Sequence, residues 1–488
     1  MRGQGQDQCA RGAGRQAWIA LALAVLALST PEAALAHGAE RGFVLLLPTG
    51  YYLIGGALAV AASFVLISFV PPAFIARAAQ ARLPLGAVPS INPAPTSLAA
   101  FFALCLLFAA GFLGSRDPLA NPLPLAIWTL WWVGITLLHA LIGNVWRFIN
   151  PWIGVYRVLD WLSGGSLARA VLPYPSWLGY WPAILAFLGF AWLELVYPAP
   201  DDPERLAIAV GLYWLFAFAG MLAFGYEAWT DRAEPFSIFF RLVAGLAPLV
   251  LTPVAEGSDR RAIAVAIPGA ALLNRDPLPL SGVLFVLLTL SSVSFDGLSR
   301  TFWWLGLGGI NPLEFPGRSA VMERNTIGLI LAFAALAACY WSAVRLGWIV
   351  AGMSGSLGRA LGAFVYAIVP ISIAFHFSHY LTALLVDGQY ALIAASDPFG
   401  SGLDLLGLGH VHVTISFLNT YGGVTIIWNL QTAAIVLGHL AGIAMAHALA
   451  LRHFGDNRGA VRSQLPLAAF MVLYTLFGLW LLSTPVFG

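Results

Sequence analysis

The sequence has no lysine and few charged residues of any kind. All 24 basic residues are arginines, and charged side chains make up 9% of the 488 residues. A soluble domain carries roughly 25%, so this deficit predicts that lipid rather than water surrounds much of the chain. The formal net charge is only +2. So small an excess argues against a nucleic-acid partner, which needs many cationic contacts to phosphate.

Cysteine pairs and several common catalytic motifs are also missing. Cys9, Cys105 and Cys339 are the three cysteines, and no two of them form a CxxC pair. This spacing excludes a disulfide framework and a cysteine zinc site. The chain also lacks a P-loop, a GxGxxG motif after a strand, a GxSxG elbow and an HExxH motif. These absences argue against an ATPase, a dehydrogenase, an α/β-hydrolase and a common zinc protease.

The N-terminus has the pattern of a cleavable export signal. Three arginines precede the apolar run 18–28, and Ala34-Leu35-Ala36 follows as an A-x-A cleavage site. The apolar run is shorter than the roughly 20 residues that a spanning helix needs. We therefore expect a signal peptide at 1–36 and a mature chain that begins at His37. Residues 37–488 are expected to form a single polytopic membrane domain.

Hydrophobic residues account for 60% of the chain, and they gather into long segments. Ten segments after the signal are long and apolar enough to cross a bilayer, which predicts an all-α bundle of transmembrane helices. Their approximate limits are 51–70, 97–114, 123–143, 177–197, 206–226, 280–298, 326–348, 361–386, 424–450 and 465–486.

The distribution of arginine predicts how the spans are oriented. With the mature N-terminus outside, fifteen arginines fall in inner loops and six in outer loops, as the positive-inside rule requires. This predicts a multi-pass protein of the bacterial inner membrane with both termini outside. The apolar segment 236–250 holds Arg241 near its middle, and it would invert every later loop if it spanned. We interpret it as an interfacial helix on the inner face.

Four histidines form two close pairs on the side predicted to be outside. His376 and His379 are three residues apart on the eighth span, so they share one helix face. His410 and His412 lie in the following loop, where an extended chain would point both side chains the same way. Neutral imidazoles bind zinc, copper, iron and nickel. The pairs therefore favour a metal site, although hydrogen bonding between helices would also explain them.

Further candidate ligands lie at the same predicted level. Glu194 ends the fourth span and Asp296 ends the sixth, and ionisable groups at membrane depth tend to be functional or paired. The mature N-terminal His37 would offer both its amine and its imidazole to one metal, a chelate that suits copper. We expect a divalent transition metal, zinc or copper, held by His376, His379, His410 and His412, with His37 as a conditional member.

At the level of motifs, the sequence resembles the fenitrothion hydrolase family of bacterial integral membrane proteins. The likeness covers most of the chain. It rests on Ala36-His37-Gly38, Phe190-Ala-Trp-Leu-Glu-Leu-Val-Tyr197, Gly225-Tyr-Glu-Ala-Trp229, Glu234-Pro-Phe-Ser237, Phe295-Asp-Gly-Leu-Ser-Arg-Thr301, His379-Tyr380 and Asp387-Gly-Gln389. The resemblance implies hydrolysis of an organophosphorus triester at the P–O–aryl bond, and a second membrane subunit as partner. It carries over no catalytic residue.

The metal prediction and the resemblance are compatible. A bound metal would lower the pKa of its water and polarise the phosphoryl group. Asp296 or Glu194 would act as a further ligand or as the general base. A small apolar substrate would reach such a site through the lipid bilayer.

Three other functions remain open from the sequence. Ten spans with scattered charges also suit a transporter or permease, perhaps for a metal. A copper-dependent membrane oxidase is a second alternative, motivated by His37. The third is a non-catalytic subunit of a membrane complex, in which replacement of the histidine pairs would be tolerated.

Overall fold

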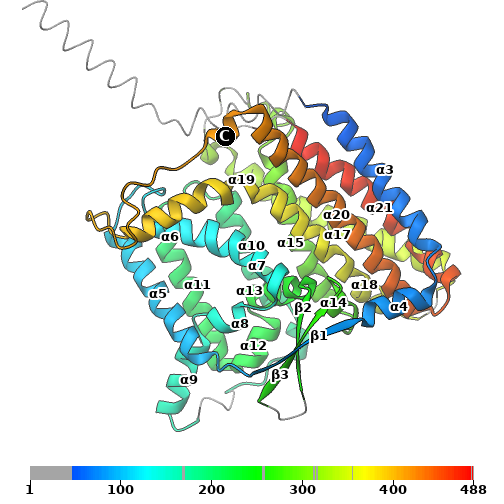
Figure 1. The fold of residues 1–488 in the computed structure, drawn as a ribbon, viewed down its shortest axis with the longest axis horizontal. Coiled ribbons are helices and arrows are strands. Elements are labelled where there is room, and N and C mark those ends of the chain that lie inside the picture. The colour runs from blue at the N-terminus through cyan, green and yellow to red at the C-terminus, as the bar shows by residue number, and fades with distance from the viewer. Residues whose placement is uncertain are drawn as a thin grey trace, which may run out of the picture. The chain divides into compact units, whose positions relative to one another are not determined.

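Ten long helices dominate the fold, as the sequence predicts. A computed structural model of the chain describes residues 47–166, 171–254, 259–311, 314, 317–353, 355–484 and 486. Within them, ten helices are long and apolar enough to cross a membrane (Figure 1). This confirms the all-α polytopic bundle. The predicted signal peptide at 1–36 and His37 lie outside the described residues.

The chain forms two compact units. The larger unit comprises Pro48–Thr414 and Ile427–Gly488, and it holds nearly all the described residues. The smaller unit comprises Met1–Leu47 and Ile415–Ile426. The described part of the smaller unit contains the short helix η7 (Ser416–Asn419) and the first residues of the ninth long helix.

Each of the ten predicted segments overlaps one long helix or a run of consecutive helices. A helix satisfies its own backbone hydrogen bonds, which is why apolar chain of this length adopts it in lipid. In chain order these are α3 (Thr49–Ser68), α5 (Ala94–Leu113), α6–η1–α7 (Pro122–Pro124, Leu125–Ile135 and Thr136–Ile142), η2–α10 (Ser176–Leu178 and Trp181–Leu195), α11 (Pro203–Phe224), α15 (Leu280–Ser299), η5–α17 (Arg318–Val321 and Met322–Val350), α18–η6–α19 (Leu357–Phe364, Val365–Ile368 and Val369–Ser396), α20 (Tyr421–Phe454) and α21 (Asn457–Ser483).

The connections between spans contain a small antiparallel sheet that the sequence analysis does not predict. Its strands are β1 (Arg82–Pro89), β2 (Leu249–Pro253) and β3 (Arg260–Ala266), in the order β1-β3-β2. The register shifts between Pro84 and Gly86, which hides the alternation by which a strand is recognised. The other connecting helices are α4 (Pro72–Gln80), α8 (Trp146–Ile149), α9 (Ile153–Leu162), α12 (Tyr226–Arg232), α14 (Ala270–Leu273) and α16 (Phe302–Gly306).

The apolar segment predicted to be an interfacial helix is shorter and more buried than expected. Its helical part is α13 (Pro235–Val243), continued by η3 (Ala244–Leu246), and β2 begins soon afterwards at Leu249. Most side chains of α13 are buried, and the helix packs against α7, α10, α12 and α19. Its apolar residues therefore face other helices. Its one arginine, Arg241, forms an ion pair with Asp231, 2.6 Å away.

Two helices lie at the centre of the larger unit. In α15 and in the α18–α19 span, 83% of the most apolar stretch is buried, compared with 17% in α5. α15 packs against α10, α17 and α19, and α19 also packs against η1. Polar side chains on α15 and α19 are therefore held inside the bundle.

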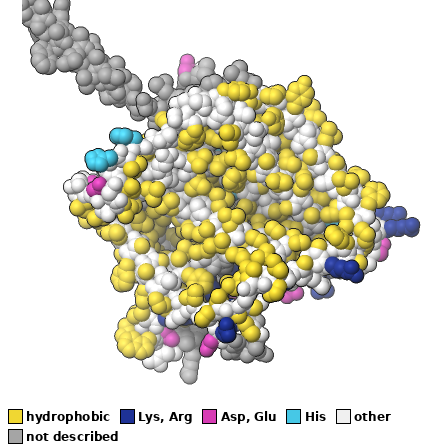
Figure 2. Space-filling view, in the orientation of Figure 1, with side chains coloured by type: hydrophobic (Ala, Val, Ile, Leu, Met, Phe, Trp, Pro, Cys, Tyr) yellow, Lys and Arg dark blue, Asp and Glu magenta, His cyan; other side chains and the backbone are white. Residues whose placement is uncertain are grey.

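The outer surface of the helices is apolar. Figure 2 shows hydrophobic side chains over most of the visible face, with charged side chains mainly near its margins. Phe102, Leu215 and Leu473 are among the many large apolar side chains that are more than half exposed. Because soluble proteins rarely expose such extended apolar surface, the helices are suited to a lipid environment.

Candidate active site

Three helices bring together a buried cluster of titratable side chains. Glu194 is the last but one residue of α10, and Asp296 lies in the last turn of α15. His379 and Tyr380 project from the middle of the α18–α19 span. Because α15 packs directly against α10 and α19, residues from three separate spans meet at one place.

Asp296 is held through both of its carboxylate oxygens. His379 Nε2 lies 2.6 Å from Oδ2, and Arg300 Nη2 lies 3.0 Å from Oδ1. The Asp296 side chain is 2% exposed, whereas His379 is 22% exposed and Arg300 is 43% exposed. The carboxylate raises the pKa of Arg300, so that the guanidinium keeps its charge. A buried anion thus contacts one imidazole and one cation that both reach the surface.

Tyr380 links the two acidic residues of the cluster. Its hydroxyl donates to Glu194 Oε1 at 2.6 Å and lies 3.1 Å from Asp296 Oδ2. One hydroxyl has one proton, so it bonds a single carboxylate at a time. Glu194, Tyr380, Asp296 and His379 therefore form a continuous chain of hydrogen-bonding groups. Arg318, at the start of η5, donates from Nη1 to the Glu194 carbonyl oxygen at 2.8 Å and fixes the end of α10.

His376 has different partners from His379, although the two lie on one helix face. Its Nε2 is 3.0 Å from the Trp132 carbonyl oxygen, and its ring contacts the rings of Trp132 and Tyr380. Because a carbonyl only accepts hydrogen bonds, Nε2 carries the proton. Its Nδ1 is buried and has no partner among the described residues. His376 therefore packs against η1, which is wound as a π-helix.

His410 and His412 lie in the loop after α19, and both are exposed. Figure 2 shows histidine side chains at the surface on the side where Figure 1 draws, in orange at the left, the loop that connects α19 to α20. Acidic residues of the loop form hydrogen bonds within the loop itself. Asp397 accepts from the amides of Ser401 and Gly402. The Ser396 hydroxyl and nearby backbone amides hold the pKa of Asp404 below its usual range.

The arrangement does not supply the predicted metal centre. Among the described residues, no three His, Cys, Asp or Glu side chains are arranged to hold a metal ion, so no three of the four paired histidines come together. Nε2 of His376 and Nε2 of His379 are already engaged with Trp132 and Asp296. His37 lies outside the described residues. These residues do not fit a four-histidine site, which remains a prediction from the sequence.

The structure adds three residues that the sequence analysis did not select. Arg300 follows Asp296 by four positions, a spacing that places two helical residues on one face and could have predicted the pair. Tyr380 adjoins His379 in the chain, so its position was available from the sequence, but its role as a link was not. Arg318 is distant from Glu194 in sequence, and no local pattern indicates their contact.

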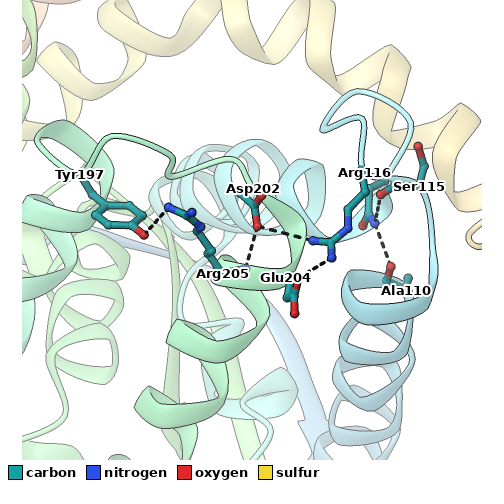
Figure 3. A network of polar contacts seen from close by, with 8 residues as sticks. Ala110, Ser115, Arg116, Tyr197, Asp202, Glu204 and Arg205 are labelled. Atoms are coloured by element: carbon teal, nitrogen blue, oxygen red, sulfur yellow. Dashed lines mark hydrogen bonds and ion pairs between the residues drawn. The ribbon is translucent and has the colours of Figure 1, made fainter. Parts of the chain in front are cut away.

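A second polar network joins the loops that follow α5 and α10. Figure 3 shows Arg116 between Asp202 and Glu204, and Arg205 beside Tyr197. The Asp202 side chain also caps α11 by accepting from the Arg205 amide at 2.9 Å. Exposed ion pairs contribute little to stability. Here they connect the loop after α5 and the turn after α10 to the start of α11.

The cluster has the parts of a general-base site. A carboxylate orients one ring nitrogen of His379, and Nδ1 of the same partly exposed ring makes no hydrogen bond to another described residue. An imidazole held in this way can take a proton from water. No protein-family model, curated protein or solved structure matches the chain.

Proposed function

We propose that this protein is a membrane-embedded hydrolase of apolar organophosphorus triesters, in which the His379–Asp296 pair activates water. The observation that carries the proposal is the 2.6 Å contact between His379 Nε2 and Asp296 Oδ2, with Arg300 on the other oxygen of the carboxylate. An acid–histidine pair of this kind fixes the tautomer and the orientation of the imidazole.

The chemical step follows from that tautomer. His379 donates from Nε2 to Asp296, which leaves the Nδ1 lone pair free to accept a proton from a water molecule. The water oxygen forms a bond to phosphorus while the P–O–aryl bond breaks, and the aryloxide leaves with the bonding electrons. The proton passes from Nδ1 to solvent, since the ring is partly exposed. Positioned general bases contribute about 10²–10⁴-fold to such reactions.

Positive charge near the pair would stabilise the transition state. The ion pair with Asp296 engages Nη2 of Arg300, and the guanidinium carries further N–H donors. Donors of this type favour the negative charge that develops on phosphoryl or thiophosphoryl atoms. Glu194 and Tyr380 act as positioning residues, because Tyr380 contacts both carboxylates and the imidazole ring of His379.

The substrate class is supported by two considerations. The motifs that contain Glu194, Asp296 and His379 are among those on which the resemblance to the fenitrothion hydrolase family rests. Apolar triesters also partition into lipid, and the site is carried by membrane-spanning helices. The resemblance also implies a second membrane subunit. Zinc or copper bound by the histidine pairs is predicted from the sequence and is tested separately below.

A proton-coupled permease is the second candidate. The chain from Glu194 through Tyr380 to Asp296 and His379 joins three spans and could pass a proton between them. Intramembrane carboxylates and histidines often serve as such relays. This reading predicts solute uptake driven by a pH gradient, with no breakage of a covalent bond.

Hydrolysis of a chromogenic triester in labelled water tests the proposal. The full chain is reconstituted in nanodiscs and given diethyl 4-nitrophenyl phosphate in water enriched in heavy oxygen. We expect release of 4-nitrophenolate and one heavy oxygen in the diethyl phosphate, because water attacks phosphorus. His453→Gln, a histidine replacement in the last turn of α20 and outside the cluster, serves as control and should keep full activity.

Two outcomes would count against the hydrolase. Heavy oxygen in the nitrophenol would mean attack at carbon, which the His379–Asp296 geometry is not proposed to support. Absence of any release, together with gradient-driven uptake of a solute in vesicles, would favour the permease.

A further inference from the structure

The larger unit contains a second feature suited to ligand binding, separate from the acidic cluster. A cavity of about 860 Å³ lies between α5, η1, α10 and α11. This volume is within the usual range for small-molecule sites, roughly 300–1,000 Å³. Its walls include Leu104 of α5, Trp131 of η1, Gly189 and Leu193 of α10, and Val210 of α11. Among the described residues, no charged side chain lines it.

Most polar side chains of the cavity wall are already bonded to the protein. Six tryptophans line the cavity, and the indole N–H groups of four of them donate to other residues. Nε1 of Trp146 is buried and has no partner among the described residues. Trp128 donates to the Pro200 carbonyl, Trp152 to Trp214, Trp192 to Thr326 and Trp214 to Pro151, over 2.9–3.3 Å. The Tyr213 hydroxyl is bonded to Glu234. A ligand that needs hydrogen bonds would find few here, so the cavity selects for hydrocarbon.

The cavity does not belong to the proposed catalytic site. None of Glu194, Asp296, His376, His379 and Tyr380 lines it. The residues of α10 that do so, such as Gly189 and Leu193, precede Glu194 and recur at helical spacing along one face. Occupancy of the cavity is therefore independent of the hydrolase proposal.

We propose that the cavity holds one acyl chain of a membrane lipid. The four helices that provide most of its lining, α5, η1, α10 and α11, are parts of candidate membrane spans, and α5 exposes Phe102 and Phe112 to the surroundings. Lining residues on α11 run from Leu206 to Trp214, a length of about 12 Å at 1.5 Å per residue. An uncharged space of this length, with most of its donors already bonded and with its walls in membrane spans, fits an acyl chain better than a polar solute.

Photochemical crosslinking with a lipid probe tests this site. The full chain is reconstituted with phosphatidylcholine that carries a diazirine in one acyl chain. Gly189→Leu fills the cavity, because a Cβ at Gly189 would meet no atom within 4 Å. Gly55→Leu is the matched control, since Gly55 is an exposed helical glycine of α3 with the same open surroundings. Ala103→Phe, from the α5 wall, is a second filling variant.

We expect crosslinks on peptides that contain Leu104, Trp131 and Val210 in the wild type and in Gly55→Leu. These crosslinks should be lost in both filling variants, whereas crosslinks on α3 from bulk lipid persist and show that the protein is folded. Cavity crosslinks that survive both substitutions would overturn the proposal, as would their absence from the wild type.

Discussion

Asp296 is the residue on which the proposed chemistry depends most, because its carboxylate contacts His379, Tyr380 and Arg300 at once. Asp296→Asn keeps the size of the side chain and removes its charge. We expect kcat for triester hydrolysis to fall by about 10²–10⁴-fold with little change in KM, because the imidazole loses its fixed tautomer. A rise in KM with kcat unchanged would contradict this role.

The Tyr380 hydroxyl joins the two carboxylates, and its removal tests whether hydrolysis needs that link. Tyr380→Phe removes the link between Glu194 and Asp296 and leaves the His379–Asp296 contact in place. The hydrolase proposal predicts that most nitrophenolate release is retained, with a stability loss of about 1 kcal/mol for the missing hydrogen bond. Enzyme assay and thermal unfolding measure the two effects. Complete loss of nitrophenolate release in a folded variant would contradict this prediction and would mean that hydrolysis requires the tyrosine hydroxyl.

Glu234 gives the protein a stability that depends on pH. This buried residue caps α13 by accepting from the amides of Phe236 and Ser237, and it also accepts from Tyr213. Burial raises the pKa of its carboxyl group above the ordinary value, and the hydrogen bonds offset this only in part. A raised folded-state pKa stabilises the fold fully below the ordinary unfolded value near 4.3, and the contribution is lost as pH rises through the folded pKa.

The variant Glu234→Gln keeps a cap acceptor but cannot ionise. We expect the Tm of the wild type to fall relative to that of Glu234→Gln as the pH is raised from acid to neutral. Scanning fluorimetry across this range provides the measurement, and parallel Tm curves for the two proteins would show that the carboxyl group does not titrate there.

Close packing between two helices depends on glycine where their backbones approach each other. α17 crosses α21 at Gly347, where an added Cβ would collide with the Ser463 carbonyl oxygen. Since backbone cannot move aside as a side chain can, Gly347→Ala should destabilise the protein by about 1–3 kcal/mol. At Gly388 of α19 an added Cβ would meet nothing within 4 Å, so Gly388→Ala should be neutral or slightly stabilising. Equal Tm values for the two variants would contradict this packing.

Local sequence patterns predict some elements of the site and miss others for physical reasons. The three-residue spacing places His376 and His379 on one face, and both rings contact Tyr380. The spacing cannot reveal that η1 is a π-helix. It also cannot reveal that the Trp132 carbonyl accepts from His376, because that hydrogen bond joins segments far apart in sequence. The prediction that His410 and His412 meet His376 and His379 depended on the path of a long loop, which periodicity does not determine.

The whole molecule follows the hydropathy of its sequence closely. All ten predicted spans are present because apolar segments of this length have only the helix to satisfy their backbone in lipid. The three-stranded sheet was missed because its strands lie in connections of mixed polarity and because β1 pairs with β3 across a long separation in sequence. Hydropathy thus predicts which helices exist, whereas contacts between them determine the site.

The orientation of the bundle is testable at this scale. In a chain without its native cysteines, we expect a membrane-impermeant maleimide added to intact bacteria to label Ser401→Cys in the loop after α19. Ser163→Cys, after α9, should be labelled only once the cells are opened, since arginines concentrate on that side. Both serines are exposed. The reverse pattern would place the acidic cluster on the cytoplasmic side.

The most direct test of the His379–Asp296 pair compares its loss with the loss of the exposed loop histidines. Nitrophenolate release is measured for His379→Gln and for the double variant His410→Gln/His412→Gln, with bound metal determined in each. The account predicts a loss of at least about 100-fold in His379→Gln and full activity in the double variant. Full activity in His379→Gln, or joint loss of metal and activity in the double variant, would contradict it and favour the four-histidine metal centre.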